Sequence, residues 1–162
     1  MSNILVAFFS ATGNTSRAAN TLADVTGADI YEIRPKEPYT QADLNWTDQS
    51  SRSTRESNDP EAMPLLADQD APVEDHDIIL LGFPIWWHVA PPVIRTFLED
   101  YDFNGKKIYL FATSGGSDLS RALPNIEKMV PGADVKAGLI ANWPHNSPAS
   151  LEKWARKEGI IA

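Results

Sequence analysis

The chain has 162 residues, of which 43% are hydrophobic, and its formal net charge is −8. This length predicts one domain over residues 1–162, and the hydrophobic fraction is ample for a single core. An acidic chain of this kind is not expected to bind nucleic acid. No run of about 18 apolar residues is present, so we expect no membrane-spanning helix.

Cysteine is absent, which excludes disulfides and thiol catalysis and permits a reducing compartment. Only Met1, Ser2 and Asn3 precede the first apolar run, which leaves no room for a signal peptide. We therefore expect a cytoplasmic protein.

Five short apolar runs alternate with helical patterns along the chain. The run at residues 78–81 is apolar without alternation, which is typical of a strand buried on both faces. The alternation predicts an α/β fold with a parallel sheet that is covered by helices on both faces. The predicted strands are Ile4–Phe9, Ile30–Ile33, Ile78–Leu81, Ile108–Phe111 and Val135–Ile140.

Capping residues mark the ends of the predicted helices. The first helix is expected to stop at Gly27, and the third to begin at Pro91-Pro92. The fourth contains Pro124, so it begins near Leu123 or is kinked there. The last is expected to start at the N-cap Ser147 and to end at Gly159, which completes the pattern.

The long connection between the second and third strands carries the acidic excess. Residues 36–77 hold 11 acidic and three basic side chains, whereas the remainder is balanced. Thr40 and Asp43 predict a helix start, and the polar stretch Ser50–Pro60 predicts a meandering loop. Two interpretations of the charge remain open: a solvated face, or a docking surface for a basic partner.

The first strand leads into Ser10-Ala11-Thr12-Gly13-Asn14-Thr15, which precedes a helical pattern. A strand, a tight hydroxyl-rich loop and a helix N-terminus together predict a phosphate-binding loop. The loop contains no Lys or Arg and lacks the glycine spacing of a dinucleotide fingerprint, so a phosphate monoester fits better than a triphosphate or pyrophosphate. A capped helix start without a ligand is the alternative interpretation.

Two further loops follow the third and fourth strands and should meet the first at the carboxyl edge of the sheet. One contains Trp86 and Trp87, and an indole can stack on a flat apolar ligand. The other contains Gly115-Gly116, where bare backbone can approach a heterocycle. Packing of either Trp on the sheet edge, and an ordinary glycine turn, are the structural alternatives.

A phosphate loop, an aromatic stack and a backbone contact together describe a site for flavin mononucleotide (FMN). The three segments, Ser10–Thr15, Leu81–Trp87 and Ala112–Ser117, resemble those of the flavodoxin family in sequence and order. The resemblance spans nearly the whole chain. It implies a flavodoxin-like three-layer sandwich whose five-stranded parallel sheet has the order 2-1-3-4-5, with FMN at the switch point.

The resemblance also implies which residues hold FMN. Side chains of the first loop and backbone of Ala11 and Gly13 would bind the phosphate, the second loop would line the ribityl chain and the ring, and the third would hold the pyrimidine edge. The expected cofactor-binding residues are Ser10, Ala11, Thr12, Gly13, Asn14, Thr15, Pro84, Ile85, Trp86, Trp87, His88, Thr113, Ser114, Gly115, Gly116 and Ser117.

The chain departs from the family pattern at two places. His88 stands where many relatives have Gly after the aromatic residue, and it is either a polar rim residue or a proton donor. Residues 113–120 contain no aromatic side chain to cover the second face of the flavin. We expect that face to be open, or covered by Trp46 or a partner subunit.

The resemblance implies a flavodoxin-like electron-transfer protein that works with a redox partner protein, as a monomer or homodimer. The alternative is an NAD(P)H-dependent FMN oxidoreductase of the quinone-reductase type, which the open flavin face would suit. A receiver-type signalling module needs acidic residues at the end of the first strand, and Phe8-Phe9-Ser10 has none.

Overall fold

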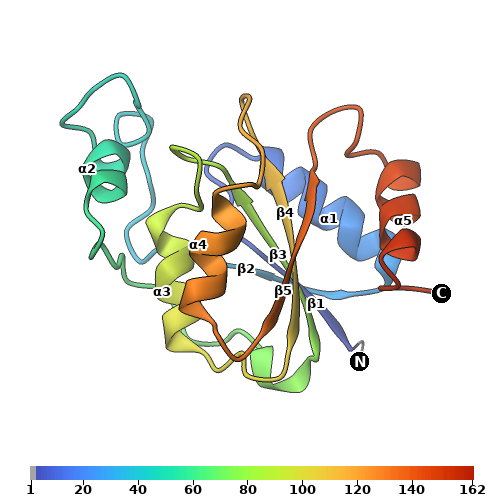
Figure 1. The fold of residues 1–162 in the computed structure, drawn as a ribbon. Helices are drawn as coiled ribbons and strands as arrows, with labels where there is room; N and C mark the ends of the chain where they lie inside the picture. The colour runs from blue at the N-terminus through green and yellow to red at the C-terminus, as the bar shows by residue number, and fades with distance from the viewer. Residues whose placement is uncertain (1–2) are drawn as a thin grey trace.

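A computed structural model describes residues 3–162 and contains one five-stranded parallel sheet (Figure 1). The strand order is β2-β1-β3-β4-β5, which confirms the expected topology. The strands are β1 (Ile4–Phe8), β2 (Asp29–Glu32), β3 (Ile78–Pro84), β4 (Lys107–Thr113) and β5 (Asp134–Ile140). The helices are α1 (Asn14–Thr26), α2 (Arg52–Asn58), the 3₁₀ turn η1 (Val73–Asp75), α3 (Pro92–Asp100), α4 (Ala122–Met129) and α5 (Pro148–Lys157).

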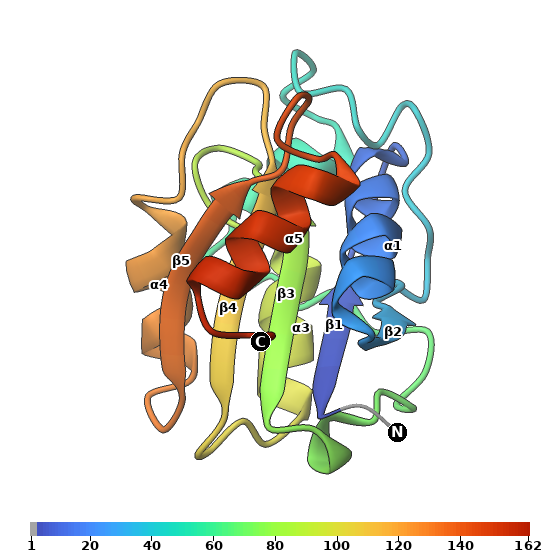
Figure 2. The same ribbon diagram turned by 90° about the vertical axis from the view of Figure 1, so that its right-hand side faces the viewer.

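Helices cover both faces of the sheet. Helices α1 and α5 lie against one face and α3 and α4 against the other, as Figure 2 shows when compared with Figure 1. The core is correspondingly divided, with Phe83 and Phe97 in the cluster under α3 and α4, and Leu22 and Trp154 in the cluster under α1 and α5. No helix within residues 3–162 is long and apolar enough to cross a membrane.

The predicted helix ends are largely confirmed. Gly27 has a φ of 69° and donates its N–H to the carbonyl of Ala23, which closes α1 as a left-handed C-cap. The hydroxyl of Ser147 accepts the N–H of Ser150 at 3.1 Å at the start of α5. Helix α4 begins at Ala122, so Pro124 lies in its first turn, where a proline is tolerated.

The predicted helix at Thr40 is wrong. Thr40 and Asp43 do exchange the expected hydrogen bonds, at 2.9 and 3.1 Å, and the Thr40 N–H lowers the pKa of the Asp43 carboxyl. The chain then makes only a turn, because Asn45 takes the N–H and hydroxyl of Thr47 and so competes with helical pairing. Helix α2 forms later, inside the stretch predicted as a loop, where Ser51 caps it.

Two strands extend further than predicted. Residues Gly82, Phe83 and Pro84 belong to β3, and Thr113 belongs to β4, because the ladder continues to the Pro84–Thr113 pair. Gly82 permits this, since a Cβ there would lie 2.2 Å from the ring of Phe111. The second and third loops therefore leave the sheet at Ile85 and Ser114.

We predict that Gly138→Ala destabilises the protein by about 2 kcal/mol, because a Cβ at Gly138 would meet the carbonyl oxygen of Leu110 at 1.9 Å. Thermal unfolding should show a Tm lower by roughly 5 °C. Gly132→Ala is the matched control, since its close contacts would be with the Asn104 side chain, which can move, and its one backbone contact, with Asn104 Cα at 3.5 Å, is an ordinary van der Waals distance. Equal Tm values for the two variants would contradict the close approach of β5 to β4.

Candidate functional site

A groove lies at the carboxyl edge of the sheet, where loops after four strands meet. Its inner compartment has a volume of ≈ 400 Å³. The loops after β1, β3, β4 and β5 all contribute to it. It is lined by Thr12, Asn14, Arg17, Pro84, Ile85, Trp86, Thr113, Ser114, Gly115, Ala141, Asn142, Trp143 and Asn146.

The outer compartment of the groove has a volume of ≈ 700 Å³. It shares Ile85, Trp86, Ser114 and Gly115 with the inner compartment, so the two compartments adjoin. The long connection between β2 and β3 supplies its far wall. Its lining is Leu44, Trp46, Ser53, Ile85, Trp86, Trp87, His88, Ser114, Gly115, Gly116 and Ser117.

The loop after β1 borders the inner compartment and holds backbone amides that have no protein acceptor within residues 3–162. Gly13 has a φ of 97°, and its N–H is taken by the hydroxyl of Ser10 at 3.1 Å. Within residues 3–162 no acceptor pairs with the N–H groups of Thr12, Asn14 and Thr15, and the first turn of α1 holds no acidic residue. This arrangement suits an anion, because the helix dipole adds to the unpaired donors.

Not every side chain of this loop faces that compartment. The Thr15 hydroxyl is buried and lies 2.8 Å from the Thr113 hydroxyl, so it ties α1 to β4. Ser10 and Ala11 line a separate cavity of ≈ 440 Å³ beside the loop. Of the four side chains expected to bind phosphate, only Thr12 and Asn14 therefore line the inner compartment.

Arg17 is a site residue that sequence reasoning missed. It lies in the first turn of α1 and is the only charged side chain that lines the inner compartment. No carboxylate within residues 3–162 pairs with it. A cation at a helix N-terminus is unfavourable on its own, which was the available signal that an anion belongs there.

The loop after β4 is fixed by Asn142, which sequence reasoning also missed. The Asn142 amide accepts the N–H of Ser114 at 3.1 Å and donates to the Ser114 carbonyl at 2.6 Å. The Gly116 N–H donates a hydrogen bond to the Ser114 hydroxyl at 3.0 Å. Within residues 3–162 the Gly115 N–H has no acceptor, so it remains available to a ligand. Because Asn142 follows β5, the strand-end rule could have found it.

The two adjacent tryptophans differ in their surroundings. Trp86 packs edge-on against Phe9 and Tyr39, with ring centroids 5.8 and 5.3 Å away. Tyr39 is held in turn by Arg52, whose guanidinium lies 3.9 Å from its ring centroid, and by a hydrogen bond to Glu56; burial raises the Tyr39 pKa well above its usual range. Trp87 is 41% exposed, so it is the indole free to contact a ligand.

Trp87 and His88 form a strained turn. Trp86 and Val89 exchange backbone hydrogen bonds at 2.9 and 3.1 Å, and the two residues between them have φ values of 47° and 72°. A two-residue turn of this kind favours Asn-Gly, because both positions are left-handed. The protein carries two side chains there that resist this geometry.

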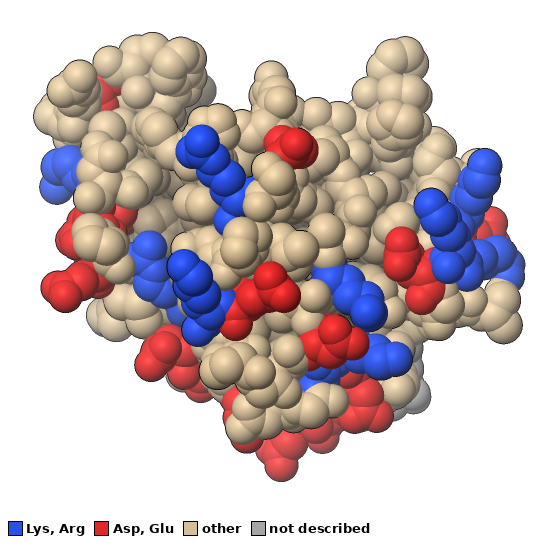
Figure 3. Space-filling view, in the orientation of Figure 1, with Lys and Arg blue, Asp and Glu red and all other residues tan. Residues whose placement is uncertain are grey.

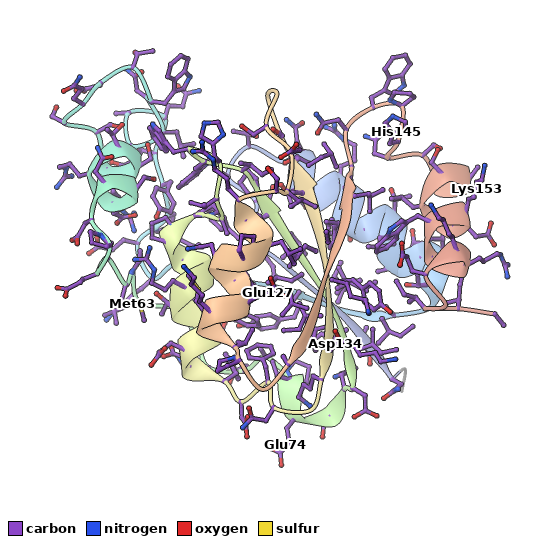
Figure 4. The ribbon with its side chains drawn as sticks, viewed as in Figure 1. Met63, Glu74, Glu127, Asp134, His145 and Lys153 are labelled. Atoms are coloured by element: carbon purple, nitrogen blue, oxygen red, sulfur yellow. The ribbon has the colours of Figure 1, made fainter. Side chains whose placement is uncertain are left out.

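The rim of the groove is aromatic and carries little charge. Trp46 is 72% exposed at the outer compartment and Trp143 is 84% exposed at the inner one. Figure 3 shows that acidic side chains gather along the lower left and the bottom of the molecule, whereas few charged atoms lie along its top. Figure 4 places Glu74 at the bottom, at the end of the sheet opposite the groove.

Comparison with known proteins identifies the family. The family model described as "Flavodoxin" matches residues 3–158. The chain belongs to the flavodoxin family. A curated relative, the flavodoxin of Klebsiella pneumoniae, is 25% identical over 152 residues, which cover 89% of this chain and 69% of that protein.

Solved structures of flavodoxin-like proteins share the fold. A protein from Bacteroides eggerthii assigned as a flavoprotein has a TM-score of 0.90 and 38% identity, and it covers 98% of both chains. A similarly assigned Bacteroides uniformis protein has a TM-score of 0.89 and 41% identity, covering 94% of this chain and 97% of its own. A Lactobacillus acidophilus flavoprotein in complex with FMN has a TM-score of 0.69 at 19% identity, with 94% and 97% covered.

We predict that His88→Gly raises the free energy of unfolding by about 1 kcal/mol, because glycine adopts a positive φ without steric cost. Denaturant unfolding measures this change. His88→Ala is the matched control, since it removes the imidazole and keeps the Cβ. If both variants gain equally, the turn is not the source of the strain.

Proposed function

We propose that this chain binds FMN non-covalently and transfers electrons between protein partners. The observation that carries the proposal is the inner compartment itself. It combines unpaired amides at a helix N-terminus with Arg17 as its one charged side chain, and it lies beside exposed indoles. A phosphate monoester attached to a flat ring system matches that order of groups.

We assign each part of FMN to a different group of residues. The N–H groups of Thr12, Asn14 and Thr15, together with the Arg17 guanidinium, hold the phosphate. Residues 84–86 flank the ribityl chain, and the Gly115 N–H pairs with the pyrimidine edge. Trp87 contacts the ring, and Trp46 is placed to cover it from the other wall of the outer compartment.

FMN supplies the redox chemistry when bound, and the protein supplies its position and surroundings. No carboxylate lines either compartment, so the walls add no negative charge beside the ring. Asp118, which follows Ser117, stays ionised at the rim, because the Ser120 hydroxyl and N–H lower the pKa of its carboxyl.

The acidic residues in the connection between β2 and β3 give only partial support to the docking of a protein partner. Within it Arg52 pairs with Glu56 at 2.9 Å and Arg34 with Asp68 at 3.5 Å, which neutralises some of its charge. Other carboxylates, such as Glu74, lie at the end of the sheet away from the groove (Figure 4). We propose that a redox partner docks at the aromatic rim, with the acidic residues of the segment 43–61 steering its approach.

The NAD(P)H-dependent alternative gains no support from the geometry. A dinucleotide needs cations or amides for its additional phosphates. No Lys or Arg lines the outer compartment, and Arg17 in the inner one faces the site assigned to the FMN phosphate.

We predict that the protein binds FMN at least about 100-fold more tightly than riboflavin, because riboflavin cannot pair with the amides and Arg17. Arg17→Gln should weaken FMN binding by about 5-fold and leave riboflavin binding unchanged. Flavin fluorescence titration measures both affinities.

Arg121→Gln is the control for these titrations, since Arg121 is an exposed arginine that lines neither compartment. Equal affinities of the protein for FMN and riboflavin would contradict the phosphate assignment. An unchanged FMN affinity in Arg17→Gln would remove that residue from the site.

We predict that Trp87→Ala weakens FMN binding by about 1–2 kcal/mol, because it removes a stacking indole. Trp87→Phe keeps an aromatic ring and should retain most of the affinity. Equilibrium titration gives the binding free energy, and thermal unfolding of the free proteins serves as the control. The stacking role is wrong if Trp87→Ala binds FMN as tightly as the unchanged protein.

A further inference from the structure

The backbone just beyond β4 depends on one side chain for its hydrogen bonds. The pairing of β4 with β5 continues to Ala141, whose N–H donates to the carbonyl of Ala112 at 2.6 Å. Within residues 3–162 the N–H and the carbonyl of Ser114 have no backbone partner. The amide of Asn142 serves both groups, since it accepts the N–H at 3.1 Å and donates to the carbonyl at 2.6 Å. This side chain therefore takes the place of a further backbone pair between the two chain segments.

The other hydrogen bonds of this loop do not tie it to β5. The Gly116 N–H donates to the Ser114 hydroxyl at 3.0 Å, which is a contact within the loop itself. The Ser117 hydroxyl lies 3.2 Å from His88 Nδ1, and this contact is exposed to solvent. Within residues 3–162, only the two hydrogen bonds to Asn142 join residues 114–117 to the chain that follows β5.

The backbone that Asn142 holds is the backbone assigned to the flavin ring. Ser114 and Gly115 line both compartments of the groove. The Gly115 N–H has no acceptor within residues 3–162, and it is assigned to the pyrimidine edge of FMN. The phosphate is assigned to a different loop, after β1. Loss of the Asn142 amide should therefore weaken the contacts of the ring and leave those of the phosphate in place.

We propose that Asn142 is a positioning residue for the flavin ring, which acts by holding the backbone of Ser114 and Gly115. Its amide offers one acceptor and one donor to Ser114, so a side chain that replaces it must offer both. The proposal rests on the proposed function in one respect, that FMN binds in the groove with its ring at the Gly115 N–H.

The test uses two probes in fluorescence titrations, FMN and lumiflavin, which has the flavin ring without the ribityl chain and phosphate. Asn142→Ala should weaken the binding of both probes by the same factor, about 10-fold, because both lose the same ring contact. Arg17→Gln should weaken the binding of FMN alone, since lumiflavin has no phosphate. Thermal unfolding of each free protein verifies that it is folded.

Asn146→Ala is the matched control. Asn146 also lines the inner compartment, but within residues 3–162 no hydrogen bond joins its side chain to the loop after β4. The affinity of this variant for lumiflavin should equal that of the unchanged protein.

A pH profile separates positioning from a purely structural role. In Asn142→Asp the ionised carboxylate can accept the Ser114 N–H but cannot donate to the Ser114 carbonyl, whereas the protonated acid can do both. The lumiflavin affinity of Asn142→Asp, divided by that of the unchanged protein, should therefore rise as the pH falls from about 7.5 to about 5. The unchanged protein supplies the baseline for the other titrating groups, and no Asp, Glu or His lines the inner compartment.

Three results would overturn the proposal: equal lumiflavin affinities of Asn142→Ala and the unchanged protein, an equal loss in Asn146→Ala, or an affinity ratio of Asn142→Asp that does not change with pH. A lower Tm of Asn142→Ala with unchanged flavin affinity would assign Asn142 a structural role alone. If neither probe binds the unchanged protein, the proposed function fails and this proposal fails with it. If both probes bind the unchanged protein and Asn142→Ala equally, only the role of Asn142 is wrong.

Discussion

The pairing of β1 with both β2 and β3 is the constraint on which the groove depends. Phe8 lies opposite Gly82 in the ladder, and the Phe9 N–H continues the pairing by donating to the Gly82 carbonyl at 3.0 Å. From this central position α1 turns to one face of the sheet and α3 to the other (Figure 2). The loops after β1 and β3 therefore diverge, and the groove is the space that remains between them.

Among the residues that line the groove, Arg17 is the one Lys, Arg, Asp or Glu. Arg17 stands alone in the inner compartment, and the rim consists of indoles, glycines and hydroxyls. No Asp or Glu is among the residues that line either compartment, and Glu74 lies at the opposite end of the sheet. An anion that enters meets one cation and free amides without a competing carboxylate, so a single phosphate group can determine the orientation of the whole ligand.

The sequence allowed the strands and the loop at residues 10–15 to be predicted, because hydrophobic runs and turn chemistry are local signals, whereas the order of the strands followed from the resemblance to the flavodoxin family. Arg17 was missed since it lies within a helical pattern, and its direction depends on how α1 packs. The sequence also could not show that Trp86 is packed and Trp87 exposed, because Trp86 packs on Phe9 and Tyr39 from distant segments. The position of α2 was mispredicted, because Asn45 competes for backbone groups after a valid capping pattern.

Two features of the outer compartment cost the free protein stability. The left-handed residues Trp87 and His88 are strained, and the buried Ser53 hydroxyl has no hydrogen-bond partner among the described residues 3–162. Two further buried polar atoms, Thr96 Oγ1 in α3 and Trp154 Nε1 in α5, also have no hydrogen-bond partner within residues 3–162. A ligand that packs on Trp87 lies directly against the strained turn at residues 86–89, so its binding is linked to the stability of that turn. Loops that follow the strands therefore line most of the groove, and the connection between β2 and β3 supplies one wall of its outer compartment.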